Sequence, residues 1–269
     1  MFICAAGDVH GALHWLYEDV LAFEASLGIR FDYVLQVGDF GIWPDPGRVD
    51  KATRDHDGAG DFPEWLAAKR EVPRPTIFIQ GNHEDFQWLH GRRHGQILPN
   101  LMWLRNGATT DLKDPRGGCI RVGGVGGCYG PSNYTCSPES LQGNAKRHYT
   151  RDEITRLACV VGVDIALFHD APTGVRFEGC ASRIGYTSKA EGLAELLARV
   201  RPRVCFFGHH HRRVDANIEG VQCIGLNKVS MPGDLVALEI APGERGWRLL
   251  AEYQRGSGVA APPRTYGAN

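Results

Sequence analysis

The stretch FICAAGDVHG, residues 2–11, decides the fold, because it joins a short apolar run directly to a carboxylate and an imidazole. Phe2 to Ala6 form a continuous apolar run, which suits a strand buried on both faces. Gly7 then permits a sharp turn, and Asp8 and His10 follow at once. Since no basic leader precedes this run, we expect a first core strand and not a signal peptide.

The same pattern recurs four times along the chain. Tyr33–Val37 runs into Gly38-Asp39, Thr76–Gln80 into Gly81-Asn82-His83-Glu84, Ile165–Phe168 into His169-Asp170, and Val204–Phe207 into Gly208-His209-His210-His211. Any one of these groups alone is typical of a turn, a helix cap or a hydrogen-bonded core histidine. In α/β sheets, however, the carboxyl ends of the strands form the ligand crevice. Five such groups in succession therefore predict one shared site.

The side chains in these groups indicate the kind of site. Mixed aspartate, asparagine and histidine ligands suit divalent manganese, iron or zinc. The eight cysteines contain no CxxC pair, so a four-cysteine zinc site is not indicated. We expect them to be buried or free thiols in a reducing cytoplasm, with a disulfide among Cys119, Cys128 and Cys136 left open.

Composition limits the remaining classes. The 269 residues are 43% hydrophobic and 23% charged, with a formal net charge of -1, so the strong positive charge of a general nucleic-acid binder is missing. No stretch approaches the roughly 20 apolar residues that a membrane span needs. We expect a cytoplasmic protein with one domain over 1–255 and a flexible tail over 256–269, rich in Gly, Ala and Pro. Nothing in the sequence sets an oligomeric state.

Helices are expected between the apolar runs. Leu13, Leu16, Val20 and Leu21 would share one face of a helix that starts near Gly11. Capping boxes are predicted at Thr150–Glu153, opening a helix to about Val160, and at Ser188–Glu191, opening a second one. Val221–Leu226, Leu235–Ile240 and Trp247–Ala251 are predicted as later strands. The alternation predicts an α/β layer structure.

Taken together, the five groups resemble those of the calcineurin-like metallophosphoesterase superfamily, over nearly the whole chain before the tail. The resemblance implies a four-layer αββα sandwich of two mixed sheets flanked by helices, and a metal-dependent phosphoric ester hydrolase. It implies two divalent ions, Mn²⁺, Fe²⁺ or Zn²⁺, with a metal-bridging hydroxide as the nucleophile. Its first ion would be held by Asp8, His10, Asp39 and His211, its second by Asp39, Asn82, His169 and His209, and His83 would face the phosphate as the catalytic residue.

The second group departs from the protein Ser/Thr phosphatase branch, which carries Gly-Asp-x-x-Asp-Arg-Gly. Here the chain reads GDFGIWP over residues 38–44, without the second Asp and the Arg. This removes the usual carboxylate partner of His83 and argues against a protein phosphatase. The resemblance therefore leaves proton donation by His83 without that support.

A closer likeness is to the lariat RNA debranching enzymes. It lies in Gly81-Asn82-His83-Glu84, Val122–Gly127, Arg147-His148-Tyr149-Thr150, His169-Asp170-Ala171-Pro172 and Arg201-Pro202. It implies a phosphodiesterase acting on a nucleotide or on RNA or DNA. Debranching enzymes commonly carry Cys where this chain has Asp8, and their lariat-recognition loop has no clear counterpart here, so the lariat itself is not implied.

Substrate contacts are expected mainly from the polar segment 128–150. The candidates are Trp43, Tyr129, Arg147, His148, His210 and Arg212. Trp43 could instead pack beneath the site, His210 could face solvent, and Arg212 and Arg213 could be surface charges. Glu84 and Asp170 could orient imidazoles, or serve as a helix cap and a surface turn. Two rival functions stay open: a phosphomonoesterase of a small metabolite or nucleotide, and a non-catalytic metal-binding scaffold.

Overall fold

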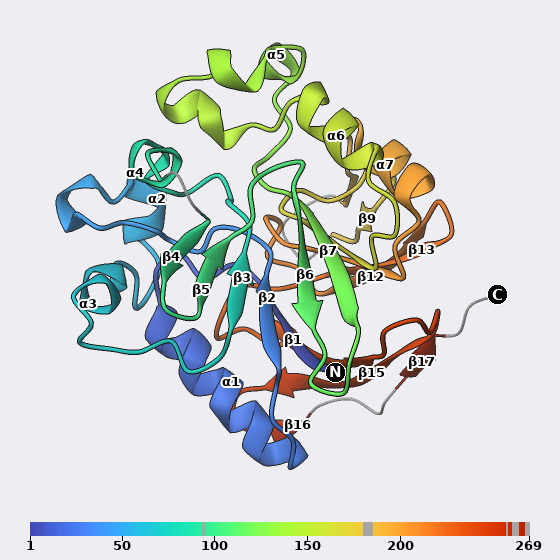
Figure 1. Cartoon of the computed structure of the whole chain (residues 1–269). Helices are drawn as coiled ribbons and strands as arrows, with labels where there is room; N and C mark the ends of the chain where they lie inside the picture. Colours follow the sequence, from blue (N-terminus) through green and yellow to red (C-terminus); the bar gives the residue numbers. More distant parts are fainter. Residues whose placement is uncertain (93–94, 180–184, 257, 260–263, 267–269) are drawn as a thin grey trace.

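The computed structural model describes residues 1–92, 95–179, 185–256, 258–259 and 264–266 (Figure 1). Within these residues two mixed sheets dominate. The first sheet has the order β16-β15-β14-β1-β2-β3-β5-β4, with β17 also paired to β15. Its strands are β1 Phe2–Ala6, β2 Tyr33–Gln36, β3 Thr76–Phe78, β4 Gln96–Leu98, β5 Leu101–Trp103, β14 Leu235–Ile240, β15 Trp247–Gln254, β16 Gly258–Val259 and β17 Arg264–Tyr266.

The second sheet has the order β12-β13-β11-β8-β7-β6. Its strands are β6 Thr109–Lys113, β7 Cys119–Val125, β8 Ile165–Phe168, β11 Val204–Phe207, β12 Val214–Ile218 and β13 Val221–Gly225. A separate pair consists of β9 Arg176–Phe177 and β10 Tyr186–Thr187. The strands that carry the predicted site are parallel within each sheet: β1, β2 and β3 in the first, β8 and β11 in the second.

The helices lie in the connections. They are α1 Leu13–Leu27, α2 Lys51–Arg54, α3 Phe62–Leu66, α4 Phe86–His90, α5 Pro131–Tyr134, α6 Arg151–Ala158 and α7 Leu193–Val200, with 3₁₀ turns η1 Pro46–Arg48, η2 Pro138–Ser140 and η3 Gly143–Arg147. Figure 1 shows α1 on one side of the molecule and α6 and α7 on the opposite side, with the sheets between them.

Alternating burial along the strands sets the layers. In β1, Cys4 and Ala6 pack in one core cluster with Leu13 and Leu16 of α1. Ile3 and Ala5, which alternate with them, belong to a second cluster that includes inner-face residues of β8 and β11. Because successive side chains of a strand point to opposite faces, β1 contacts a helix on one side and the other sheet on the other.

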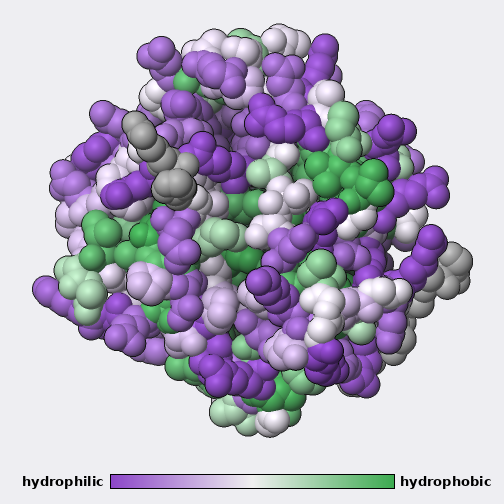
Figure 2. All heavy atoms as spheres, viewed as in Figure 1, coloured by the Kyte–Doolittle hydropathy of each residue, from purple (hydrophilic) through white to green (hydrophobic). Residues whose placement is uncertain are grey.

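The second sheet repeats this arrangement. Leu167 and Phe206 face the first sheet, whereas Phe168 and Phe207 pack with residues of α6 and α7. The predicted four-layer αββα sandwich is therefore confirmed. Hydrophilic residues cover most of the face in Figure 2. The apolar runs are buried in three clusters: between α1 and the first sheet, between the two sheets, and between the second sheet and helices α6 and α7.

Most predicted elements are confirmed, and two details are wrong. The capping box at Thr150 is formed with Glu153. That at Ser188 is not: α7 starts at Leu193 after Gly192, and the Ser188 hydroxyl donates to the carbonyl of Ala171 instead. Leu21 is 41% exposed and does not share the buried face of α1.

Segment 256–269, expected to be a flexible tail, contains β16 and β17, and its remaining residues beyond Gly256 lie outside the described ones. Cys119, Cys128 and Cys136 are free, while Cys180 lies outside the described residues. Among the described helices, none is long and apolar enough to cross a membrane.

Candidate metal centre

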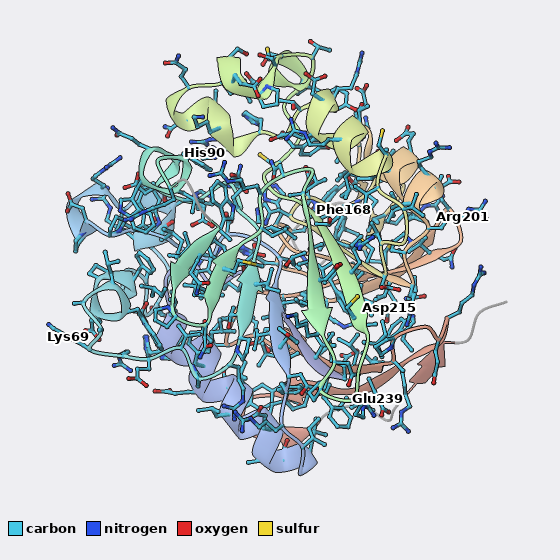
Figure 3. All side chains as sticks on the ribbon, in the orientation of Figure 1. Lys69, His90, Phe168, Arg201, Asp215 and Glu239 are labelled. Atoms are coloured by element: carbon cyan, nitrogen blue, oxygen red, sulfur yellow. The ribbon has the colours of Figure 1, made fainter. Side chains whose placement is uncertain are left out.

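The carboxyl edges of the two sheets meet, and the predicted ligand groups lie at that junction. Asp8, Asp39 and Asn82 follow β1, β2 and β3, whereas His169 follows β8 and His209 follows β11. Figure 3 labels Phe168, the last residue of β8, directly before His169. Ligand groups from five strands thus reach one place because the strands that carry them run parallel within each sheet.

One set of atoms converges around Asp8. The His10 and His211 Nε2 atoms are 3.0 Å apart, and His211 Nε2 lies 3.0 Å from Asp8 Oδ2. His10 Nε2 lies 3.8 Å from Asp39 Oδ2. Two imidazole nitrogens and two carboxylates that face one point are a donor set for a divalent cation, and Asp8, His10 and His211 meet the geometry for one.

A second set converges around His169. Its Nδ1 lies 2.8 Å from the carbonyl of Val37, so Nδ1 carries the proton and Nε2 presents its lone pair. That Nε2 lies 2.9 Å from Asn82 Oδ1 and 3.6 Å from Asp39 Oδ2. Asp39 Oδ2 therefore faces a histidine of each set, and Asp8 also meets the geometry for a cation with Asp39 and His169. A backbone carbonyl that fixes the tautomer of a histidine is a common feature of metal sites.

His209 is placed beside the second set by its backbone. Its N–H donates to the Asp8 carboxylate at 3.0 and 3.1 Å, and its ring centroid is 5.1 Å from that of His169. His209 has φ 65°, and His10, Asp39 and His211 also have positive φ. Left-handed backbone at four non-glycine residues in one place is strain of the kind that gathers at functional sites.

The electrostatics of the site call for cations. Asp8 and Asp39 are buried. Burial raises the pKa of both carboxyl groups, but hydrogen bonding from His211 to Asp8 and the nearby imidazoles outweigh it, so each pKa is lowered. Burial lowers the pKa of His10 and of His209 to about 4. The site thus combines ionised carboxylates with the neutral imidazoles of His10 and His209, and buried charges require partners.

The glycines before the ligands are required by close packing. A Cβ on Gly38 would overlap the His169 ring, and one on Gly81 would overlap Asp39. A Cβ on Gly208 would overlap the Asp8 carboxylate. Each of these glycines therefore lies against a candidate ligand that comes from a different strand.

Glu84 holds the loop after β2 in place. Its buried carboxylate accepts hydrogen bonds from the backbone N–H groups of Phe40 at 2.8 Å, Gly41 at 3.0 Å and Ile42 at 2.8 Å. Glu84 thus neither orients an imidazole nor caps α4, whose N-cap is Asp85. Burial raises the pKa of Glu84 to about 8.

His83 has a carboxylate partner after all. Its Nδ1 lies 2.7 Å from Oδ2 of Asp50, and its backbone N–H donates to Asp39 Oδ1 at 2.7 Å. The usual Asp of the second group is missing, and Asp50 supplies a carboxylate to His83 from another position. Burial lowers the pKa of His83, but Asp50 and Asp39 outweigh burial, so the pKa is raised.

Asp50 is held by the chain around it. Its carboxylate also caps α2 by accepting the N–H of Thr53 at 2.7 Å. In the sequence, Asp50 could be recognised only as a residue that suits a helix N-cap, and nothing linked it to His83. Its contact with His83 depends on the path of the chain between β2 and β3.

The proposed substrate residues divide into two groups. His210 and Tyr129 lie next to the site: His210 Nε2 is 3.1 Å from Asp170 Oδ1, and the Tyr129 N–H donates to Asp170 Oδ2 at 2.9 Å. Asp170 is thus a buried anchor and not a surface turn. His210 also contacts the Tyr186 hydroxyl and packs against Phe177.

The other candidates are placed differently. Trp43 is buried. Arg147 donates to the carbonyl of Asn144, and Arg212 is exposed. The Arg213 guanidinium is paired with Glu252 and Asp215.

His148 borders a cavity of about 250 Å³ behind the loop after β3. Gln80, Trp103 and Lys146 also line this cavity, as does His90, which Figure 3 labels. His148 Nδ1 also lies 3.6 Å from the Cys128 Sγ atom.

Two further residues near the first ligand set had no signal in the sequence pattern. The His56 ring stacks on His10 with centroids 3.9 Å apart, and Lys228 Nζ lies 3.2 Å from His56 Nδ1. Burial and the charge of Lys228 lower the pKa of His56. His56 follows no apolar strand, and Lys228 follows the predicted strand Val221–Leu226 but is not a metal-ligand side chain, so only the tertiary structure reveals the pair.

Comparison with known proteins gives the family. A model described as calcineurin-like phosphoesterase matches residues 1–213. Lariat debranching enzymes of Entamoeba histolytica, Danio rerio and Arabidopsis thaliana are 24%, 23% and 24% identical over 88%, 78% and 81% of this chain. The chain spans 72% of the Entamoeba enzyme, 40% of the Danio enzyme and 56% of the Arabidopsis enzyme.

Solved structures agree on the fold. A protein of Thermus thermophilus is similar with a TM-score of 0.51 and 14% identity over 93% of both chains. Another structure has a TM-score of 0.58 and 12% identity over 88% of this chain and 93% of that chain. Because the family model covers most of the sequence, the chain belongs to the calcineurin-like phosphoesterase family.

Replacing Gly81 by alanine should abolish metal binding at the junction, since the new Cβ must displace Asp39 from both ligand sets. Metal analysis after dialysis against Mn²⁺ measures this. Gly47→Ala is the matched control, because a Cβ there meets only the carboxylate of Asp45, at 3.2 Å. Full metal content in a folded Gly81→Ala protein would contradict the described packing.

Proposed function

We propose that this calcineurin-like phosphoesterase is a phosphodiesterase that hydrolyses a nucleotide or nucleic-acid phosphodiester with two divalent metal ions. One observation carries the proposal: two sets of ligand atoms share the carboxylate of Asp39, with His83 hydrogen-bonded beside them. The similarity to proteins named lariat debranching enzymes favours a diester over a monoester.

The residues at the junction fit two cations. Asp8, His10, Asp39 and His211 would hold the first ion, and Asp39, Asn82, His169 and His209 the second. The buried His10 Nδ1 has no hydrogen-bond partner among the described residues, so no neighbouring acceptor draws its ring away from the site. When bound, such a pair of ions neutralises charge on the phosphate oxygens and activates a water.

His83 would assist at the leaving oxygen. Its Nδ1 proton is held by Asp50, which leaves Nε2 for the substrate. A carboxylate behind an imidazole fixes its orientation and stabilises its charged form. His83 can then donate a proton to the oxygen that leaves, or stabilise the negative charge that develops there.

The pairing of Arg213 favours a diester over a phosphomonoester. A monoester dianion carries more charge than a diester and is commonly clamped by guanidinium groups. Arg213 is engaged by Glu252 and Asp215. The scaffold alternative is disfavoured, because every predicted ligand is retained and the side chains of Asp8, His10, Asp39, Asn82, His169 and His211 converge on the junction.

Hydrolysis of two chromogenic substrates tests the proposal. Metal-stripped protein reloaded with Mn²⁺ should cleave bis-p-nitrophenyl phosphate faster than p-nitrophenyl phosphate. Oligonucleotides with 2′,5′ and 3′,5′ linkages then identify the preferred diester. Faster cleavage of the monoester would replace the proposal by the phosphomonoesterase alternative, and two bound metals without turnover of any of these substrates would favour the scaffold.

Asp50→Asn should lower kcat and shift its pH dependence. Because Asp50 raises the pKa of His83, its neutral replacement lowers that pKa, and a group that must be protonated then loses its proton at lower pH. The basic limb of the kcat profile should therefore move to lower pH, with metal content unchanged. Asparagine retains the cap of α2, so the helix should persist.

Two further variants complete this comparison. His83→Ala should lose roughly 10²-fold or more in kcat and respond little to a second Asp50→Asn change, since both residues act as a unit. Asp57→Asn, an exposed aspartate on the same segment, should behave as wild type. An unshifted pH profile in Asp50→Asn would show that Asp50 does not act through His83.

A further inference from the structure

We propose that Lys228 and His56 form a second phosphate subsite beside the metal centre, one that takes the phosphate next to the cleaved one in a nucleic-acid strand. The inference rests on the proposed phosphodiesterase function and narrows its substrate from any diester to one with at least two phosphates. It concerns residues outside both ligand sets.

The backbone of Lys228 is fixed beside the first ligand set. Lys228 lies between β13 and β14, and the N–H of the next residue, Val229, donates to the carbonyl of Asp8 at 2.8 Å. A Cβ on Gly7 would overlap the carbonyl oxygen of Asn227, so the two loops are in direct contact. Lys228 therefore cannot drift from the site as a lysine on a free loop can.

His56 is held by its ring contacts with two candidate ligands and by a backbone hydrogen bond. Its ring stacks on His10 with an interplanar angle of 10°, and its centroid is 5.8 Å from that of His211 in an edge-on arrangement. The His56 N–H is bonded to the carbonyl of Thr53 at 3.0 Å, which anchors it to the turn after α2. His56 thus lies over the first ligand set without belonging to it.

The pair presents hydrogen-bond donors and positive charge. Lys228 Nζ donates to His56 Nδ1 at 3.2 Å, so the neutral imidazole carries its proton on Nε2. In the described part of the chain, Lys228 has no carboxylate within ion-pairing distance and its ammonium has no second hydrogen-bond partner. Two ammonium N–H groups and one imidazole N–H remain for a ligand, and all three suit an anion.

The position of the pair selects the neighbouring phosphate. The cleaved phosphate must reach the Nε2 side of His10, where the ligand atoms converge. His56 occupies the face of the same ring, and the Lys228 ammonium lies against His56 Nδ1. A phosphate bound there is displaced from the metal centre, as the next phosphate along a strand is. Phosphate contacts of this kind set the register of a strand without reading its bases.

The subsite is tested by comparing the kinetics of Lys228→Ala on a substrate with one phosphate and on a substrate with two. With bis-p-nitrophenyl phosphate, kcat/KM should stay at the wild-type value. With a trinucleotide, KM should rise roughly tenfold with kcat little changed, and log(kcat/KM) should depend less steeply on log salt, by about 0.7 in slope for one lost phosphate contact. Lys228→Arg should restore most of the affinity.

The control is Lys69→Ala, an exposed lysine that Figure 3 shows at the edge of the molecule and that should leave both substrates unaffected. Equal losses on both substrates, or no loss on the trinucleotide, would overturn the subsite. If the wild-type protein cleaves no diester, the proposed function fails separately. Fluorescence anisotropy of a labelled trinucleotide then decides the subsite, because the Lys228→Ala protein should still bind it more weakly.

Discussion

The buried carboxylate of Asp39 is the constraint on which the rest of the site depends. One of its oxygens accepts the N–H of His83, and the other faces His10 and His169, which come from different sheets. Asp8 adds a second buried carboxylate close by. Two ionised carboxylates beside the neutral imidazoles of His10 and His209 form an arrangement that a cation between them would stabilise. The metal ions are thus implied by the electrostatics as well as by the family.

The packing of the two sheets brings histidines from both of them to the Asp39 carboxylate. Parallel strands place their carboxyl ends at one edge, and face-to-face packing of the sheets brings the two edges together. Gly38, Gly81 and Gly208 then let the loops approach to within contact of ligands from other strands. Glu84 fixes the loop after β2 through three backbone N–H groups, so Asp39 keeps its strained backbone at φ 50°.

The ligand groups could be predicted from the sequence because their signal is local. An apolar run, a glycine and a ligand side chain are adjacent in the chain, as in Val204–Phe207 before Gly208 and His209. The β-strands followed from the same runs, whereas the four-layer order was implied by the family resemblance. The predicted capping box at Ser188 does not form, because the Ser188 hydroxyl donates to the carbonyl of Ala171 in a tertiary contact.

The partners of the site residues could not be predicted in this way. Asp50 contacts His83, and Lys228 contacts His56, across 33 and 172 residues of chain. Each of these contacts depends on how a loop is laid across the sheet edge, which no periodicity records. The sequence therefore predicts where ions would bind, whereas the orientation of His83 and the groups next to the ligands require the structure.

Anomalous diffraction from crystals grown with Mn²⁺ tests the central claim most directly. The account predicts two peaks roughly 3.5–4 Å apart, one on each side of the Asp39 carboxylate, with His10 and His211 at one and Asn82 and His169 at the other. A single peak, or two peaks that Asp39 does not join, would contradict it.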